Sequence, residues 1–274
     1  SIFFNPKLEK CIPTYEKPEL LERLLDSIVK QSYDNYFIIV TDNSETKSVE
    51  KVIGQVNNLK IWYWHNECQL GAAGNTNKAI NKAIEKGAEL IKIMYQDDWF
   101  SETEALKKMI EKLTQEKLDI VFTGSWEVYD SYTKKRICSP DEIDKIEKDE
   151  GALFRANLLG APSGMLFKPC ECRLDTTYTW LLDVDFYLRL LKGKKWGYIY
   201  EPLISIGHDG EQLTDYYSQN PLLILEETRR QYKKYEWLHT SPNRLYLWKK
   251  TWGCFKSYLK FKIIILKSGK CKKG

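Results

Sequence analysis

The sequence lacks the features that mark several common functional classes. It has only three histidines, and its seven cysteines are an odd number spread widely along 274 residues. No two cysteines have the C-x2-C spacing of a zinc site, and the single residue between Cys170 and Cys172 suits neither a disulfide nor tetrahedral zinc. We therefore expect free thiols in a reducing compartment.

Long apolar runs are also missing. No stretch reaches the ~20 residues of a membrane-spanning helix, and the run near the end, residues 263–266, is far too short. The first residues do not form a charged region followed by an apolar core, so no signal peptide is expected. The chain is therefore expected in the cytoplasm. A hydrophobic content of 43% and a charged content of 29% predict a folded core.

Acidic residues disappear after Glu236, although the net charge of the whole chain is only +4. Ten basic residues lie between positions 237 and 274. Apolar residues recur there at steps of three and four, which predicts a helix with an apolar stripe beside lysines. The stripe consists of Trp248, Trp252, Phe255, Leu259, Ile263 and Leu266. An aromatic, basic helix of this kind favours an anionic membrane surface. A helix docked on the rest of the protein is the alternative, and nucleic acid is not an expected partner.

The first ~125 residues alternate between strand and helix patterns. A continuous apolar run at residues 37–40 indicates a buried strand, residues 61–64 and 90–95 are expected as further strands, and Pro18 marks the first turn of a helix. A small-residue loop at residues 71–74 precedes a helix over residues 75–85, and Ser101 with Glu104 suggests a capping box for the next helix. Such alternation predicts a parallel sheet with helices on both faces.

Carboxylates follow two of these predicted strands. Asp42 ends one strand, and Asp97-Asp98 ends another about 55 residues later. Ligands of parallel α/β sheets bind beyond the carboxyl ends of the strands, so these side chains are expected to share a site. Adjacent carboxylates repel each other, and a Mg²⁺ or Mn²⁺ ion bridging a diphosphate would offset that cost. The alternative is a pair of aspartates that caps a helix.

Two dinucleotide and phosphate signatures are absent near the small-residue loop. Residues 71–74 lack both the G-x-G-x-x-G spacing and the G-K-[ST] ending of a P-loop. The sequence therefore disfavours dinucleotide-dependent and P-loop enzymes. A loop that leads into a helix could still approach a diphosphate.

The second half is less regular. Residues 126–150 predict a hairpin or mobile loop, residues 160–164 a tight loop, residues 180–191 a helix and residues 204–214 a polar loop. On the predicted helix, Asp185 is four residues before Arg189 and can pair with it, which leaves Asp183 as a candidate general base. The alternative is two ordinary surface charges. His208, in the polar loop, could be a metal ligand, a diphosphate donor or simply exposed.

Taken together, these segments resemble family 2 glycosyltransferases of the GT-A fold. The match runs in order over about residues 8–215. The matching segments are residues 12–15 (IPTY), 37–44 (FIIVTDNS), 70–77 (LGAAGNTN), 94–99 (MYQDDW) and 182–189 (LDVDFYLR), followed by His208, Gln212 and Thr214. Two positions depart from the family pattern. Gln96 replaces a frequent aspartate, so the metal site would hold one carboxylate fewer, and Leu182 replaces the usual glutamate before the base.

The resemblance implies a role for each matched residue. Asp183 would deprotonate the acceptor hydroxyl, while Asp98 and His208 would bind Mn²⁺ or Mg²⁺. Donor-binding residues would be Pro13, Thr14, Tyr15, Asp42, Asn43, Gly71, Asn75, Asn77, Gln96 and Asp97. Acceptor contacts would come from Ser163, Trp180 and Arg189.

The expected fold is α/β, a single GT-A domain with a mainly parallel central sheet and a C-terminal helical extension. Residues 1–236 would form the domain, with a nucleotide-binding half (1–125) and an acceptor half (126–236), and residues 237–274 the basic tail. The expected activity is inverting transfer of a hexose or N-acetylhexosamine from a nucleotide-sugar, UDP-sugar first, to a lipid-linked glycan in bacterial surface polysaccharide (O-antigen or capsule) synthesis. The enzyme would work on the inner face of the cell membrane. A non-catalytic nucleotide- or sugar-binding relative and a nucleotidyltransferase stay open as alternatives.

Overall fold

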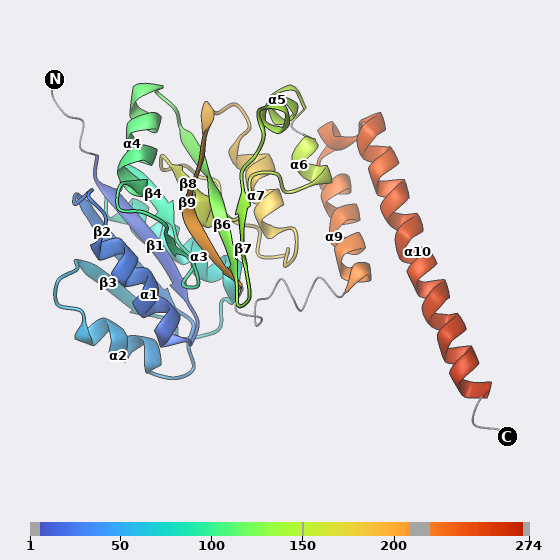
Figure 1. The fold of residues 1–274 in the computed structure, drawn as a ribbon, viewed down its shortest axis with the longest axis horizontal. Coiled ribbons are helices and arrows are strands. Elements are labelled where there is room, and N and C mark those ends of the chain that lie inside the picture. The colour runs from blue at the N-terminus through green and yellow to red at the C-terminus, as the bar shows by residue number, and fades with distance from the viewer. Residues whose placement is uncertain (1–5, 150, 209–219, 271–274) are drawn as a thin grey trace.

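A computed structural model describes residues 6–149, 151–208 and 220–270, with side chains described as far as residue 256. The first half alternates as the sequence predicts (Figure 1). Its elements are β1 (Leu8–Thr14), α1 (Pro18–Val29), β2 (Tyr36–Asp42), α2 (Ser48–Gln55), β3 (Ile61–His65), α3 (Gly71–Glu85), β4 (Leu90–Ile93), β5 (Trp99–Phe100) and α4 (Ala105–Gln115).

The second half adds hairpins and short helices to the same sheet. Its elements are β6 (Ile120–Tyr129), β7 (Thr133–Arg136), α5 (Pro140–Lys148), α6 (Ala152–Arg155), the 3-10 helix η1 (Pro162–Gly164), β8 (Met165–Phe167), α7 (Leu182–Leu190), β9 (Trp196–His208), α9 (Pro221–Lys234), the 3-10 helix η2 (Glu236–Leu238) and α10 (Ser241–Lys270).

The described strands form one nine-stranded sheet in the order β3-β2-β1-β4-β8-β6-β9-β5, with β7 paired to β6. The pairs among β1, β2, β3 and β4 are parallel, as expected. The long β6–β9 pair is parallel as well, whereas β8 lies antiparallel between β4 and β6, and β5 and β7 are antiparallel edge strands, so the mainly parallel sheet carries short antiparallel additions. The parallel half therefore carries the strand-end edge on which a ligand site is expected.

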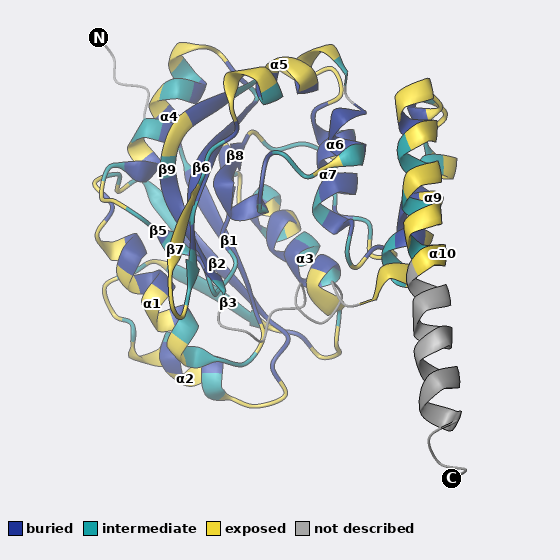
Figure 2. Cartoon of the chain, turned by 45° about the vertical axis from the view of Figure 1, so that its right-hand side comes forward, coloured by how far each residue is buried: buried dark blue, intermediate teal, exposed yellow. Residues whose placement is uncertain are grey.

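Each face of the sheet is covered by its own apolar cluster, which explains why the strand sequences are apolar without alternation. Cys11 and Ile39 pack on the face of α3 and α7, whereas their neighbours Ile12 and Val40 pack on the face of α1 and α4. Figure 2 shows the central strands of the sheet buried in dark blue, with exposed residues on the outer sides of the helices.

Several local expectations are wrong. Residues 71–74 are not a loop but the first turn of α3, which Gly71 enters with a φ of 68°. Ser101 and Glu104 form no capping box, because α4 begins at Ala105 without a side-chain cap. A real capping box lies at Ser139 and Glu142, which begin α5 inside the stretch expected as hairpin or loop. The β6–β7 hairpin itself is confirmed.

The boundaries around the two late motifs also differ from expectation. The helix expected over residues 180–191 is shorter, Leu182–Leu190. The expected polar loop is strand β9 as far as His208, and the remaining positions, with Gln212 and Thr214, lie outside the described residues. Strand β9 continues to His208 because it pairs with β6, and the polar sequence of this segment gives no sign of that pairing.

The C-terminal part is an antiparallel pair of helices beside the domain (Figure 1). Helix α9 packs against α10, and the first turns of α10 also contact α6, where Asn243 accepts a hydrogen bond from Arg155 (2.5 Å). Among the described residues, no helix has the length and apolar character needed to cross a bilayer. The predicted boundary between the catalytic domain and the tail at residue 236 stays a proposal. Helix α9 lies before that boundary in the sequence but packs against α10, which lies after it.

Candidate active site

The carboxyl ends of β1, β2 and β4 meet at one edge of the sheet. Thr14 is paired with Asp42 in the parallel register, and the backbone N–H of Asn43 donates to the Thr14 carbonyl (3.0 Å). Met94, just after β4, donates its N–H to the Cys11 carbonyl on the other side of β1 (3.0 Å). The sequence-predicted convergence of the strand ends is therefore present.

Asp42 is fully buried at this edge, and protein donors engage both of its carboxylate oxygens. Thr14 and Ser44 donate their hydroxyls to Oδ1 (3.1 and 2.6 Å), and the Ser44 N–H donates to the same oxygen (2.9 Å). The Tyr63 hydroxyl donates to Oδ2 (2.8 Å). A direct bond from Asp42 to a nucleotide would have to share these oxygens, so in this structure Asp42 organises the rim that surrounds it.

Three buried asparagines hold the neighbouring segments together. Asn66 donates its amide to the side-chain oxygens of Asn43 (2.6 Å) and Asn75 (2.8 Å), and Asn75 donates to the Thr14 carbonyl (3.1 Å). These bonds join β1, β2 and the first turn of α3. Asn43 and Asn75, expected as donor contacts, lie at the site but are only 6% and 3% exposed.

Gln96, Asp97 and Asp98 follow β4 and face different partners. The Gln96 side chain is bonded to the backbone of Tyr15, whose ring is 52% exposed. Arg23 donates to the Asp97 carbonyl (2.6 Å) and stacks over Trp99 (4.0 Å to the ring centroid). The segment is therefore clamped to the loop after β1 and to α1.

Asp98 is the buried carboxylate of the segment, with 2% exposure. Burial raises its pKa well above the ordinary value, and the charge of Asp97 adds to that shift. Hydrogen bonds from Ser163 and from the Gly207 N–H (3.3 Å), together with Lys92, act in the opposite direction. Burial lowers the pKa of Lys92 to about 7, and its ammonium donates to the carbonyl oxygens of Ser163 and Ile93.

These surroundings fit a shared divalent cation. Burial and the Asp97 charge both disfavour an ionised Asp98, and a cation would offset that penalty. In the described part of the chain, no three His, Cys, Asp or Glu side chains are grouped closely enough to hold a metal alone. Mg²⁺ and Mn²⁺ fit a site of one or two carboxylates completed by substrate phosphates, and Asp98 with Asp97 supplies such carboxylates.

His208, the other expected metal ligand, is one residue beyond Gly207 and is already oriented by the protein. Its Nε2 lies 2.6 Å from Glu127 Oε2, and the Ser125 hydroxyl donates to the other oxygen of Glu127 (2.6 Å). The imidazole stacks on Tyr129 with ring centroids 4.2 Å apart. One ring nitrogen is therefore engaged by Glu127, whereas no hydrogen bond from the described residues reaches Nδ1.

Asp183 lies in the first turn of α7 and is partly buried. Burial raises its pKa to about 7, and the Arg136 guanidinium acts in the opposite direction. The buried hydroxyl of Tyr95, next to Gln96, has a pKa raised by burial first and then by Asp183, Asp98 and Asp97. Because Asp183, Asp98 and Asp97 all act on Tyr95, Asp183 lies near the Asp97-Asp98 segment. A carboxylate with a pKa near neutrality suits a general base.

Three other expected site residues have different roles here. Asn77 exchanges two hydrogen bonds with the backbone of Leu174 (both 2.8 Å), so its amide joins two protein segments. Ser163 is fully buried, its hydroxyl accepts the Tyr95 N–H (3.0 Å) and it also hydrogen-bonds Asp98, so here it supports the Asp98 carboxylate, and its contact with the acceptor stays a prediction. Arg189 is paired with Asp185 (2.7 Å), as the helix spacing predicts. Trp180 lies just before α7 and stays a predicted acceptor contact.

Glu127 and Arg136 are site residues that the sequence patterns missed. Both come from the β6–β7 hairpin, which was expected only as a hairpin or loop. A signal was present for Glu127, an acidic residue in a strand that is mostly buried. No local pattern marks Arg136, because its relation to Asp183 depends on how β7 and α7 pack.

Comparisons with known proteins agree with this geometry. The family model described as Glycosyl transferase family 2 matches residues 11–174. WcaA of Escherichia coli K12, assigned as a colanic acid biosynthesis glycosyl transferase, is 29% identical over 97 residues, 35% of this chain and 34% of WcaA. The GalNAc(5)-diNAcBac-PP-undecaprenol beta-1,3-glucosyltransferase of Campylobacter jejuni is 29% identical over 96 residues, 34% of this chain and 30% of that protein. Each match spans about a third of the relative's length.

Two solved structures share the fold at low sequence identity. S. aureus TarS 1-349, in complex with UDP-GlcNAc, aligns with a TM-score of 0.62 at 15% identity and covers 80% of this chain and 66% of TarS 1-349. The mannosyltransferase PcManGT from Pyrobaculum calidifontis, in complex with GDP-Man and Mn²⁺, aligns with a TM-score of 0.60 at 13% identity and covers 98% of this chain and 81% of its own. The architecture is thus that of GT-A glycosyltransferases.

Proposed function

The chain belongs to glycosyl transferase family 2, and from that premise we propose that it transfers a sugar from a nucleotide-sugar donor with inversion at the anomeric carbon. The observation that carries the proposal is that two unlike carboxylates, Asp98 and Asp183, both lie close enough to Tyr95 to raise the pKa of its hydroxyl. Asp98 is buried beside Asp97 and suits a cation, whereas Asp183 lies partly exposed with a pKa near 7 and suits a base.

The donor is proposed to bind along the strand-end edge. Tyr15 offers an exposed ring over the loop after β1, and the N-terminus of α3 at Gly71 offers backbone N–H groups to a diphosphate. Asp42 and Asn43 hold these walls in place through their buried hydrogen bonds. UDP is the nucleotide we propose first, carrying a hexose or N-acetylhexosamine.

A divalent cation, Mn²⁺ or Mg²⁺, is proposed to be held by Asp98 with Asp97 nearby. When bound, it would neutralise the negative charge that develops on the departing diphosphate. His208, oriented by Glu127, would present Nδ1 toward the same group, either to the cation or to the diphosphate. Gln96 would not be a ligand, because its amide is used by Tyr15.

Asp183 is proposed to take the proton of the acceptor hydroxyl. Its first-turn position on α7 and its partial exposure would let the hydroxyl reach the carboxylate. A base on one side and a departing diphosphate on the other describe a single in-line displacement, which inverts the anomeric configuration. Removal of a general base typically lowers the rate by about 10²–10⁴-fold.

A lipid-linked glycan is the proposed acceptor, and the name of the Campylobacter jejuni relative, which includes undecaprenol, supports it. The name of WcaA, with colanic acid, supports a bacterial surface polysaccharide as the product. O-antigen and capsule belong to the same class of product. A cytoplasmic enzyme on the inner face of the membrane would meet such an acceptor.

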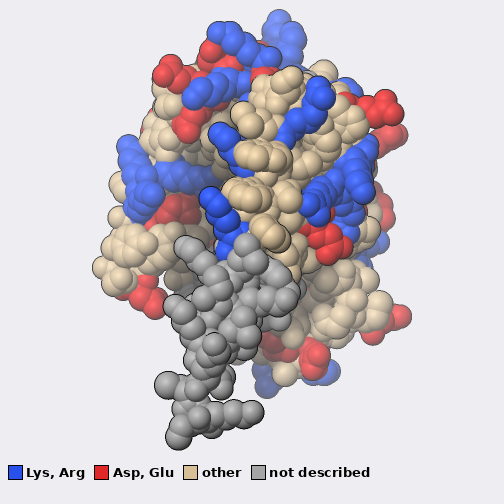
Figure 3. All heavy atoms as spheres, turned by 90° about the vertical axis from the view of Figure 1, so that its right-hand side faces the viewer, with Lys and Arg blue, Asp and Glu red and all other residues tan. Residues whose placement is uncertain are grey.

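The proposed membrane contact is the outer side of α9 and α10. Five of the nine large apolar side chains exposed in the described residues lie on these two helices: Leu222, Leu245, Trp248, Trp252 and Phe255. Trp252 is stacked between Trp248 (6.5 Å) and Phe255 (5.8 Å), and Lys256 lies over its ring (5.6 Å). Figure 3 faces this side, where blue Lys and Arg atoms border an uncharged strip. Aromatic rings flanked by cations suit an anionic lipid surface.

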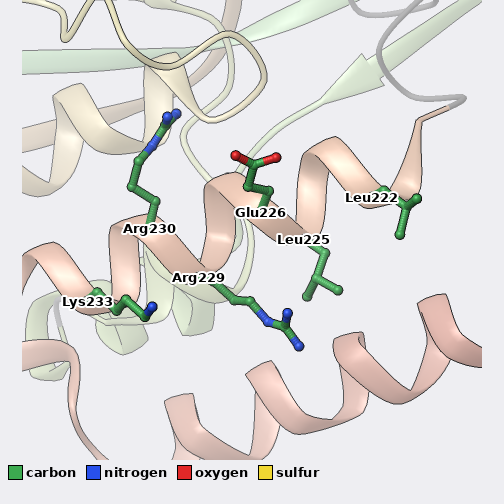
Figure 4. A pocket seen from close by; sticks show the side chains of 6 residues that line it. All are labelled: Leu222, Leu225, Glu226, Arg229, Arg230 and Lys233. Atoms are coloured by element: carbon green, nitrogen blue, oxygen red, sulfur yellow. The ribbon is translucent and has the colours of Figure 1, made fainter.

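The described residues that line a surface groove of about 400 Å³ all belong to α9: Leu222, Leu225, Glu226, Arg229, Arg230 and Lys233 (Figure 4). They include neither Asp98 nor Asp183, so the groove lies apart from the proposed reaction centre. The first turns of α10 dock on α6 while Trp248, Trp252 and Phe255 stay exposed, so α10 can pack on the domain and still, as we propose, contact a membrane.

A donor screen tests the proposed function. Nucleotide-sugars are added with and without Mn²⁺, and the melting temperature and the release of nucleoside diphosphate with an acceptor extract are measured. We expect Asp98→Ala to lose the metal-dependent stabilisation. Asp183→Asn is expected to keep that stabilisation but to lose turnover. If either variant transfers sugar at the wild-type rate, the substituted aspartate does not have the role proposed for it.

The same screen separates the alternatives. A protein that binds nucleotide but never consumes any donor with any acceptor extract would be a binding relative. Products that release phosphate or pyrophosphate instead of a nucleoside diphosphate would indicate a nucleotidyltransferase.

A further inference from the structure

One buried carboxylate from the C-terminal part of the chain holds the segment that leads into α7. Glu227 on α9 is only 2% exposed. Its Oε1 accepts the backbone N–H of Thr179 (2.7 Å), and its Oε2 accepts the N–H groups of Trp180 (2.9 Å) and Leu181 (2.8 Å). Three consecutive backbone donors therefore converge on one side chain 46 to 48 residues away.

Helix α7 has no cap of its own. Leu181 occupies its N-cap position, and its side chain cannot accept a hydrogen bond, so the usual local solution for the unpaired N–H groups is missing. A carboxylate at a helix N-terminus also interacts favourably with the helix dipole. Glu227 thus supplies, from another helix, a charged acceptor for the N–H of the N-cap residue Leu181 and for the N–H groups of the two residues before it.

Arg230, one turn after Glu227, secures the same contact. It donates to the Thr177 carbonyl (2.5 Å), its guanidinium lies over the Tyr178 ring (4.5 Å) and it approaches Glu227 Oε1 within 3.7 Å. Figure 4 shows Arg230 pointing from α9 toward the domain, whereas Arg229 points toward α10. The two neighbouring arginines therefore serve opposite sides of α9.

A second tether joins the end of α9 to the first turn of α7. Asp185 Oδ1 accepts the Tyr235 hydroxyl (2.6 Å) and the Lys234 ammonium (3.1 Å), while Arg189 binds the other oxygen (2.7 and 2.8 Å). Asp185 is fully buried. Asp183 lies two residues after Leu181 and two before Asp185, so the two tethers lie on either side of it in the sequence.

We propose that Glu227 is a positioning residue that fixes the first turn of α7 and thereby the carboxylate of Asp183. The inference rests on the proposed function of Asp183 as base. It assigns α9 to the reaction centre as well as to the membrane-facing side. A catalytic group held within a narrow range of geometry reacts faster, and small displacements lower the rate strongly.

The test compares Glu227→Gln with Glu226→Gln. Both substitutions remove one negative charge from adjacent positions of α9, but Glu226 is exposed and Glu227 is buried at α7. Glutamine keeps the size of the side chain but is neutral and has only one acceptor oxygen, so all three N–H groups lose a charged partner and at least one of them loses its acceptor. Glu227→Asp, which keeps the charge on a shorter side chain, is the second variant.

Two readouts are needed, and the first does not depend on activity. Amide hydrogen exchange over residues 176–186 should be faster by about tenfold in Glu227→Gln, since a hydrogen bond to a charged group contributes at least that factor. The exchange of Glu226→Gln should equal the wild type. Unchanged exchange in Glu227→Gln overturns the proposed contact.

The second readout is the split between kcat and the KM for the donor. Glu227→Gln should lower kcat by about tenfold or more while the donor KM and the donor-induced rise in melting temperature stay at the wild-type values. Glu227→Asp should recover part of kcat. A wild-type kcat, or a joint loss of kcat and donor binding, overturns the positioning role.

Failure of the proposed function has a different signature. If the wild-type protein transfers no sugar from any donor, the exchange measurement still decides whether Glu227 holds α7, but a role in positioning a base is then excluded. If the wild type is active and the Glu227 variants show the same hydrogen exchange and the same kcat as Glu226→Gln, the proposed function stands and this inference fails.

Discussion

Gln96 and Tyr15 exchange two hydrogen bonds across 81 positions of sequence. The Gln96 amide donates to the Tyr15 carbonyl (2.9 Å), and the Tyr15 N–H donates to the Gln96 side-chain oxygen (3.0 Å). The residue that departs from the family pattern is therefore a clamp between the loop after β1 and the segment after β4. Both loops belong to the proposed donor site.

The first prediction concerns this clamp. Gln96→Ala removes both bonds, and each contributes roughly 0.5–1.5 kcal/mol, so the donor affinity should fall by about tenfold. Gln96→Asp should lose affinity as well, because its shorter side chain carries no amide donor. Titration of the donor by calorimetry measures both variants. Tighter metal-dependent binding by Gln96→Asp would instead mean that position 96 is an incomplete metal ligand.

A second prediction follows from the close approach of Gly207 to Asp97. A Cβ at position 207 would lie 2.4 Å from the Asp97 carbonyl oxygen and 3.0 Å from the Arg23 guanidinium. Gly207→Ala should push the Asp97-Asp98 segment aside, abolish the metal-dependent stabilisation by donor and lower stability by about 1–3 kcal/mol. Thermal unfolding with and without Mn²⁺ and donor measures both effects.

Gly54→Ala is the matched control for that prediction. It adds the same methyl group within α2, where no atom lies within 4 Å of the new Cβ. It should bind donor like the wild type and gain up to about 1 kcal/mol of stability from helix propensity. Equal donor responses from the two alanine variants would contradict the close packing of Gly207 on Asp97.

The third prediction concerns the pH dependence of Asp183, whose pKa burial raises to about 7. A general base must be ionised, so kcat should rise with pH and level off above about 7. A folded-state pKa above the unfolded value means that the folded protein binds the proton more tightly. Asp183 therefore destabilises the fold increasingly as pH rises from the unfolded pKa through about 7.

Asp183→Asn tests both consequences together. It should lower kcat by about 10²–10⁴-fold and yet raise the melting temperature at pH 8, with a smaller difference at pH 5. Calorimetric unfolding at the two pH values and initial rates across the pH range are the measurements. A melting temperature that falls at pH 8 would show that Asp183 is a stabilising partner of Arg136 and not a destabilised base.

The fourth prediction concerns the aromatic stripe of α10. Replacement of Trp248, Trp252 and Phe255 by serine should reduce binding to anionic liposomes by at least about tenfold, since each fully buried aromatic contributes roughly 1.5–3 kcal/mol. Binding of the wild type should weaken as salt is raised, because the lysines act through a screened charge interaction. Co-sedimentation with neutral and anionic vesicles measures both effects.

Tyr200→Ser is the control for the stripe, because Tyr200 is also exposed (46%) but lies on β9. It should bind vesicles like the wild type. If the triple variant also sediments like the wild type, the membrane contact of α10 is wrong and its helix docks elsewhere.

The sequence alone determined the elements whose causes are local. Apolar runs specify the parallel strands around Ile39 and Ile91, the four-residue spacing of Asp185 and Arg189 predicts their ion pair, and the order of motifs identifies the family. Polar residues at strand ends must meet at one edge of a parallel sheet, so the neighbourhood of Asp42 and Asp98 could also be predicted.

Only the tertiary structure decided what each polar group at that edge does. Asp42 has both oxygens engaged, Asn77 is used by Leu174 and Ser163 is buried, although sequence resemblance assigned all three to ligands. Glu127 orients His208 across 81 residues, and Glu227 accepts the N–H of Leu181, the N-cap residue of α7, across 46. Local spacing carries no information on such pairings, because they arise when strands and helices far apart in the chain pack together and leave buried donors and acceptors that must be satisfied.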